Sequence, residues 1–156
     1  MTIDYIETLA KAIHANYVKE QTAAGSANLP NVVPWDELPE EFKESNRNAA
    51  RSFEEKLRSI DCEIAPADTS RPAVEFFDDE TILKLARVEH DRWMQEKLAN
   101  GWTYAPVRDN AKKHHHMLIP YEKLPSEEQQ KDINVVNNII PLLRSVGLRV
   151  CRKEHT

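Results

Sequence analysis

The feature that most constrains the fold of this chain is an internal repeat. Residues 9–20 and 85–96 share an ordered pattern of Leu-Ala, a basic residue, His, an aromatic residue and Glu, at an offset of 76 residues. Residues 33–39 and 119–125 share a β-branched residue, Pro, an aromatic residue, an acidic residue and Leu-Pro, at an offset of 86. The pattern indicates two copies of one helix–loop–helix unit, each too small to bury a sufficient core alone.

Apolar residues at three- and four-residue spacing predict four helices. They span residues 3–20, 39–60, 78–100 and 125–147. Thr2 is expected to cap the first helix, and Asp78 or Asp79 to begin the third. Gly101 should end the third helix in a left-handed conformation. Pro141 must kink or restart the fourth, because it removes a backbone donor and crowds the preceding turn.

The second predicted helix carries a stripe expected to be buried, formed by Phe42, Ala49, Phe53, Leu57 and Ile60. The expected fold class is all-α (mainly α), a tandem pseudo-twofold repeat of helix–loop–helix units. The first, degenerate copy would span residues 1–64, a linker 65–77 and the second copy 78–152. We expect the two copies to pack as one compact domain with long loops and short extended ends.

Composition excludes several classes of protein. The three glycines stand apart, so neither the dinucleotide-binding nor the P-loop glycine motif is present. A net charge of −5 argues against a general nucleic-acid binder. No apolar run is long enough to span a membrane, and the first residues lack a secretory signal. Cys62 and Cys151 lie outside any CxxC pattern, which is typical of reduced thiols, so we expect a cytoplasmic protein.

The second copy contains motifs that resemble the ryanodine receptor repeat (RyR domain) family. The matching residues are Leu85-Ala86, His90, Trp93, Gly101-Trp102-Thr103-Tyr104, Arg108-Asp109, Ile119-Pro120-Tyr121, Leu124-Pro125 and Leu142-Leu143 with Gly147. The first copy keeps His14, Pro34, Leu38-Pro39 and Ser45-Asn46-Arg47 but lacks the Gly-Trp-x-Tyr segment. The resemblance implies a small standalone protein of the bacterial or phage type, with two tandem repeats, no pore and no catalysis.

The resemblance also implies an adenine-nucleotide site between the two copies. Carried over by position, the aromatic residues beside the base become Tyr17 and Trp93. The polar residue after Leu-Pro becomes Asn46 in the first copy and Asp132 in the second. Asp132 departs from the Asn that the family often has there, and a carboxylate at this position would repel phosphate.

Several of these residues have a structural interpretation beside the functional one. Trp93 could stack on a ligand or anchor the core with its indole N–H bonded to a carbonyl. His14 and His90 occupy matched positions, and a buried histidine beside an aromatic ring usually donates a hydrogen bond to a loop carbonyl. Glu89 is expected to pair with Arg92 as a weak surface ion pair rather than to form an acid–base cluster with His90.

The run His114-His115-His116 is the only metal-like feature, and no neighbouring Cys or His completes a tetrahedral site. We therefore expect neither a metal nor a cofactor. With Arg108, Lys112, Lys113 and Lys123 nearby in the sequence, the run favours a basic loop that meets an anion or an acidic partner.

The sequence predicts a non-catalytic ligand-sensing or interaction module that binds a nucleotide-like or other planar polar ligand. The candidate binding residues are Tyr17, Trp93, His14, His90, Asn46, Asp132, Arg87 and Arg108. An alternative is a protein-interaction or homo-oligomerisation module without a small ligand. A remote alternative is a small-nucleotide hydrolase that uses His90. Neither nucleic acid nor a membrane is expected as a partner.

Overall fold

The computed structural model describes residues 5–154, which form a mainly helical protein with two small two-stranded sheets. The chain groups into two compact units. Unit 1 contains residues 5–75 and 139–154, and unit 2 contains residues 76–138. The C-terminal residues 139–154 thus group with the N-terminal half, whereas the sequence assigned them to the second copy.

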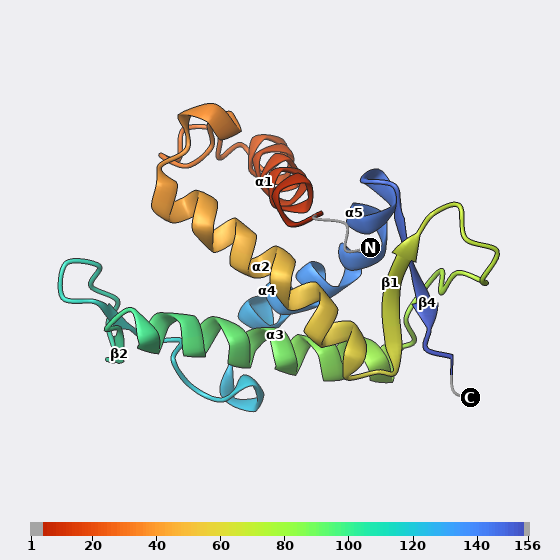
Figure 1. The fold of residues 1–156 in the computed structure, drawn as a ribbon. Helices are drawn as coiled ribbons and strands as arrows, with labels where there is room; N and C mark the ends of the chain where they lie inside the picture. The colour runs from red at the N-terminus through yellow and green to blue at the C-terminus, as the bar shows by residue number, and fades with distance from the viewer. Residues whose placement is uncertain (1–4, 155–156) are drawn as a thin grey trace. The chain divides into compact units, whose positions relative to one another are not determined.

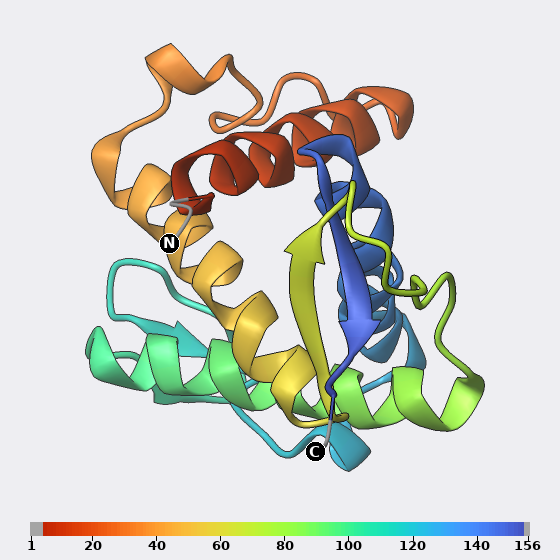
Figure 2. The same ribbon diagram turned by 45° about the vertical axis from the view of Figure 1, so that its right-hand side comes forward.

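Unit 1 is built on a pair of packed helices and a β-ribbon (Figures 1 and 2). The helices are α1 (Ile6–Ala23) and α2 (Glu40–Arg58), with the short 3-10 turn η1 (Trp35–Glu37) between them. The ribbon pairs β1 (Cys62–Pro66) with β4 (Leu148–Arg152) in antiparallel register, with Ile64 opposite Val150. The short helix α5 (Ile139–Ser145) packs against both α1 and β4.

Unit 2 repeats the order of helix, long loop, 3-10 turn and helix. Its helices are α3 (Asp79–Ala99) and α4 (Ser126–Asn137), which pack against each other. The loop between them contains β2 (Thr103–Tyr104) and β3 (His114–His115), which pair in parallel, and η2 (Tyr121–Lys123). The loop therefore returns to the C-terminal end of α3 before the chain reaches α4.

The helix boundaries follow the predicted signals closely. The Asp78 side chain caps α3 by accepting a hydrogen bond from the Thr81 amide at 2.8 Å. Gly101 follows α3 with φ +86°, the left-handed conformation expected of it. Pro39 lies one residue outside α2, so its missing N–H costs the helix nothing. The predicted cap Thr2 lies outside the described residues.

The fourth predicted helix is interrupted as Pro141 requires. α4 ends at Asn137 and α5 begins at Ile139, so the chain restarts its helix two residues before the proline. A proline ring clashes with the carbonyl four residues earlier, which here belongs to Asn137 at the end of α4. The break also marks the point at which the chain leaves unit 2 for unit 1.

The predicted stripe of α2 is buried only in its C-terminal half. Phe53 and Leu57 are almost fully buried, whereas Ala49 and Ile60 are partly exposed. Phe42 is 37% exposed, so the prediction that it belongs to the core is wrong. It lies in the first turn of α2, ahead of the stretch from Ala50 onward that carries the buried residues of this helix.

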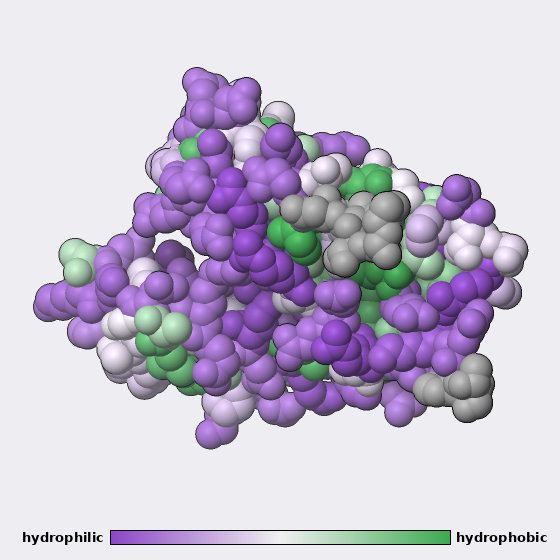
Figure 3. Space-filling view, in the orientation of Figure 1, coloured by the Kyte–Doolittle hydropathy of each residue, from purple (hydrophilic) through white to green (hydrophobic). Residues whose placement is uncertain are grey.

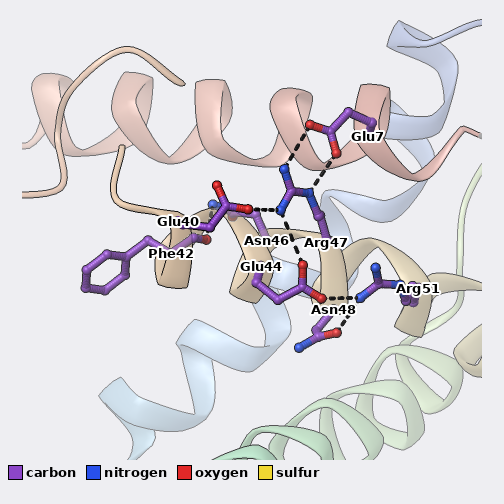
Figure 4. Close-up of polar contacts among 8 residues, drawn as sticks. All are labelled: Glu7, Glu40, Phe42, Glu44, Asn46, Arg47, Asn48 and Arg51. Carbon is purple, nitrogen blue, oxygen red and sulfur yellow. Dashed lines mark hydrogen bonds and ion pairs between the residues drawn. The ribbon is translucent and has the colours of Figure 1, made fainter. Parts of the chain in front are cut away.

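A charged cluster on the outside of unit 1 joins α1 to α2 (Figure 4). Arg47 on α2 donates to both carboxylate oxygens of Glu7 on α1, at 2.7 and 3.1 Å. The same guanidinium also contacts Glu40 at 2.7 Å and Glu44 at 3.3 Å. A bidentate pair of this kind fixes the register of two helices more firmly than a single lysine contact does.

No helix among residues 5–154 is long and apolar enough to cross a membrane. Figure 3 shows a visible face that is largely hydrophilic, with small, separate hydrophobic patches.

The two phenylalanines of α2 offer a matched test of this core. Phe53→Ala should lower the free energy of unfolding by about 3–5 kcal/mol, because it leaves a cavity among buried side chains. Phe42→Ala should change it by less than about 1 kcal/mol, because the ring is already partly in water. Urea unfolding followed by circular dichroism measures both, and equal losses would contradict the assigned burial.

Candidate functional site

A buried histidine joins the first helix of each unit to the loop that follows. In unit 1, Nε2 of His14 lies 2.6 Å from the carbonyl oxygen of Val33. In unit 2, Nε2 of His90 lies 2.6 Å from the carbonyl oxygen of Ile119. Because a carbonyl oxygen can only accept, each ring donates through Nε2. The hydrogen bond predicted for these two histidines is therefore confirmed at both positions.

Aromatic rings surround both histidines in the same pattern. The His14 ring lies 6.1 Å from Trp35 in an edge-on arrangement, and the His90 ring lies 6.4 Å from Tyr121 in the same way. His90 also stacks on Trp93, with ring centroids 5.6 Å apart. Such contacts add about 0.5–1.5 kcal/mol each to the burial of the rings.

The two histidines differ in what faces their second nitrogen. Nδ1 of His90 lies 3.5 Å from a carboxylate oxygen of Asp132, whose side chain is largely buried. At the matching position of unit 1, the amide of Asn46 donates to the Phe42 carbonyl of its own helix. Burial lowers the pKa of His90, but the Asp132 carboxylate and the Ile119 carbonyl together raise it by more, so this pKa lies above its usual 6.5.

The candidate site is an open pocket of about 430 Å³ that lies within unit 2. Side chains of α3, of the loop 108–117 and of α4 line this pocket. Its lining residues include His90, Trp93, Lys97, Arg108, His115, His116, Glu128, Lys131 and Asp132. Trp93 is only partly buried, so part of its ring is available to a ligand. A pocket of this volume suits a small organic ligand.

The three carboxylates that line the pocket each face a basic side chain that also lines it. Glu89 pairs with Arg92 at 2.6 Å, Glu128 with Lys131 at 3.0 Å, and Asp132 with His90 at 3.5 Å. The other two lining cations, Lys97 and Arg108, have no carboxylate within ion-pair distance among residues 5–154.

The positive charges of Lys97 and Arg108 lie close together. Burial lowers the pKa of Lys97, the Glu96 carboxylate raises it, and the positive charge of Arg108 lowers it again. The Lys97 ammonium also lies over the Trp102 ring, 4.7 Å from its centroid. The nearest polar partner of Arg108 is the side-chain oxygen of Asn110, at 2.9 Å. Two neighbouring cations that are not ion-paired can attract an anion.

His115 and His116 form a polar wall beside these cations. Burial and the charges of Arg108, His116 and Lys97 lower the pKa of His115 to about 4. Its Nδ1 accepts a hydrogen bond from the Met117 amide at 3.1 Å, so the neutral ring carries its proton on Nε2. Nδ1 of His116 is buried without a hydrogen-bond partner in the described part of the chain. Such an atom is one that a ligand group can satisfy.

The predicted binding residues divide between the two units. His90, Trp93, Arg108 and Asp132 line the pocket of unit 2. Arg87 lies on the same helix outside it, where it pairs with Glu122 at 2.8 Å. The remaining three, His14, Tyr17 and Asn46, belong to unit 1, and their part in binding stays a prediction.

The predicted list of binding residues omitted Lys97, His115 and His116. The signal that could have included them is Gly101: a left-handed residue at the end of α3 turns the following loop back along the helix. The β2–β3 pairing then brings the histidine run beside Trp93, with the His115 ring 4.9 Å from it. The sequence does not show this pairing, because each strand is only two residues long.

The histidine run and the acidic residues form no metal cage. Among residues 5–154, no three His, Cys, Asp or Glu side chains are grouped so as to hold a metal ion.

The expected pair of Glu89 and Arg92 is present, but Glu89 is buried rather than at the surface. Breaking it would therefore leave a buried charge, which costs more than the loss of a surface ion pair.

A comparison with known protein families places this geometry in context. The model of one family, the RyR domain, matches residues 63–152, which include both helices of unit 2 and every residue of the pocket. This match covers more than half of the chain. The chain therefore belongs to the RyR domain family.

Proposed function

We propose that this protein is a non-catalytic cytoplasmic module that reversibly binds a planar, anionic small molecule of the nucleotide-like class in the pocket of unit 2. The observation that carries the proposal is the pair of cations Lys97 and Arg108 beside the partly exposed Trp93 ring. A planar group would stack on Trp93, and its anionic group would meet the two cations. Stacking of a base on an aromatic side chain contributes about 1–3 kcal/mol.

The neutral His115 supports an anionic ligand without adding charge to the pocket. With its pKa lowered to about 4, its ring presents an Nε2–H donor at neutral pH. One stacked ring and two charge-assisted hydrogen bonds together contribute about 4–9 kcal/mol, and the upper end of this range corresponds to micromolar affinity.

We also propose that the two units descend from one repeated helix–loop–helix element. The support is that His14 and His90 donate to Val33 and Ile119, which are the residues that the sequence alignment pairs. The 3-10 turns η1 and η2 begin at aligned positions as well.

A pair of tryptophan variants tests the stacking wall. Trp93→Leu should weaken binding of ATP, ADP-ribose or a cyclic nucleotide by about fivefold to 150-fold, the equivalent of one lost stacking contact. Trp35→Leu is the matched control, because Trp35 belongs to unit 1 and lines no part of the pocket. Isothermal titration calorimetry measures both. Failure of every nucleotide to bind the unaltered protein would contradict the proposal, and turnover of any of them would contradict its non-catalytic part.

A second pair of variants tests the anion site. Arg108→Gln should weaken binding severalfold and flatten its dependence on salt, because one charge that meets the anion is lost. Lys112→Gln is the control: it removes an exposed charge from the same loop without altering the pocket lining. Titrations at 50 and 300 mM NaCl compare the two, and equal effects would show that only the overall field of the loop matters.

Protein interaction is the second candidate function, and one observation favours it. Unit 2 exposes three apolar or aromatic side chains near the end of α3, namely Leu98, Tyr104 and Val107. Light scattering that shows a concentration-dependent dimer, disrupted by Val107→Glu, would support this candidate over a small ligand.

A further inference from the structure

The ring of His90 is held between two acceptors on opposite sides. Nε2 donates to the Ile119 carbonyl at 2.6 Å, and Nδ1 faces the Asp132 carboxylate at 3.5 Å. A neutral imidazole has one N–H, so it can donate to only one of these groups, whereas the protonated ring can donate to both. The arrangement therefore satisfies the imidazolium form better than the neutral form.

The surroundings of the ring are acidic on three elements. From α4 it faces Asp132, and from its own helix Asp91 adds a further negative charge. In η2, the ring of Tyr121 lies edge-on to the His90 ring, and the positive charge of His90 lowers the pKa of Glu122. Two cations of its own helix are engaged with carboxylates: Arg92 with Glu89, and Arg87 with Glu122.

We propose that His90 and Asp132 form a proton-dependent latch on the wall of the pocket, and that the latch regulates anion binding there. With His90 protonated, the ring ties α3 to both α4 and the loop before η2, and the pair carries no net charge. With His90 neutral, the same wall is more negative by one charge, and it repels an anion more strongly. The regulatory part of this proposal rests on the proposed function.

The latch is specific to unit 2. His14 shares the carbonyl contact, but the position that matches Asp132 is Asn46, whose amide is bonded to Phe42. A neutral amide does not stabilise the protonated ring as a carboxylate does. The substitution that distinguishes the two units thus also provides the matched test, because Asp132→Asn gives unit 2 the residue of unit 1.

The first measurement is the titration of each histidine ring by nitrogen-detected NMR, without any ligand. His90 should titrate above 6.5, and Asp132→Asn should lower its pKa. The unfolded ring titrates near 6.5, so the stabilisation is complete below that pH and is lost as pH rises through the folded-state pKa. Thermal stability of the unaltered protein relative to Asp132→Asn should therefore be greatest near pH 6 and decline towards pH 8.5.

The second measurement is the affinity for naphthalene-1,5-disulfonate, a planar dianion whose charge is constant between pH 6 and pH 8.5. Binding should weaken about threefold or more across this range, because the wall loses one positive charge. Asp132→Asn should remove most of this dependence.

The outcomes separate the two proposals. If His90 titrates alike with and without Asp132, the latch is overturned whatever the dianion does. If His90 titrates as expected but affinity is constant with pH, its regulation of the pocket is overturned. If the dianion binds at no pH while the ring behaves as expected, the anion pocket is contradicted and the latch stands as a structural feature.

Discussion

The hydrogen bond from a helix histidine to a loop carbonyl determines how each unit is assembled. It anchors the loop at the residue before the Pro-aromatic pair, at 2.6 Å in both units. The aromatic residue then packs on the histidine ring, and the leucine three residues later is buried in the core, Leu38 in one unit and Leu124 in the other. A buried carbonyl left without this donor would cost about 1–3 kcal/mol. The second helix of each unit starts from this anchored loop.

The two units share an order of helix, loop, 3-10 turn and helix but differ in the side chains that they carry. Unit 2 inserts the segment that follows Gly101, and this segment returns two histidines and Arg108 to the face of α3 that carries Trp93. Unit 1 lacks the insertion, and the ion pair of Arg47 with Glu7 connects its helices α2 and α1. The proposed ligand binding thus depends on side chains and one loop of unit 2 rather than on the order of its helices.

Local signals in the sequence were sufficient for the helices and for the two histidine contacts. Caps, proline positions and apolar spacing act within a few residues, so Asp78, Gly101 and Pro141 could be interpreted without the fold. The pairing of β1 with β4 could not be predicted, because the two strands are more than 80 residues apart and neither alternates clearly. The exposure of Phe42 and the composition of the pocket depend on such distant contacts, which no single segment encodes.

The division of unit 1 into two distant stretches of sequence has a consequence for biosynthesis. Unit 2 is continuous, from residue 76 to residue 138, so all of its contacts are available once the ribosome has passed α4. The ribbon of unit 1 must wait, because β1 leaves the exit tunnel long before its partner β4 is translated. During that interval the face of β1 that is buried in the folded protein, including Cys62, is exposed in the nascent chain. Chaperone binding or rapid completion of translation would protect it.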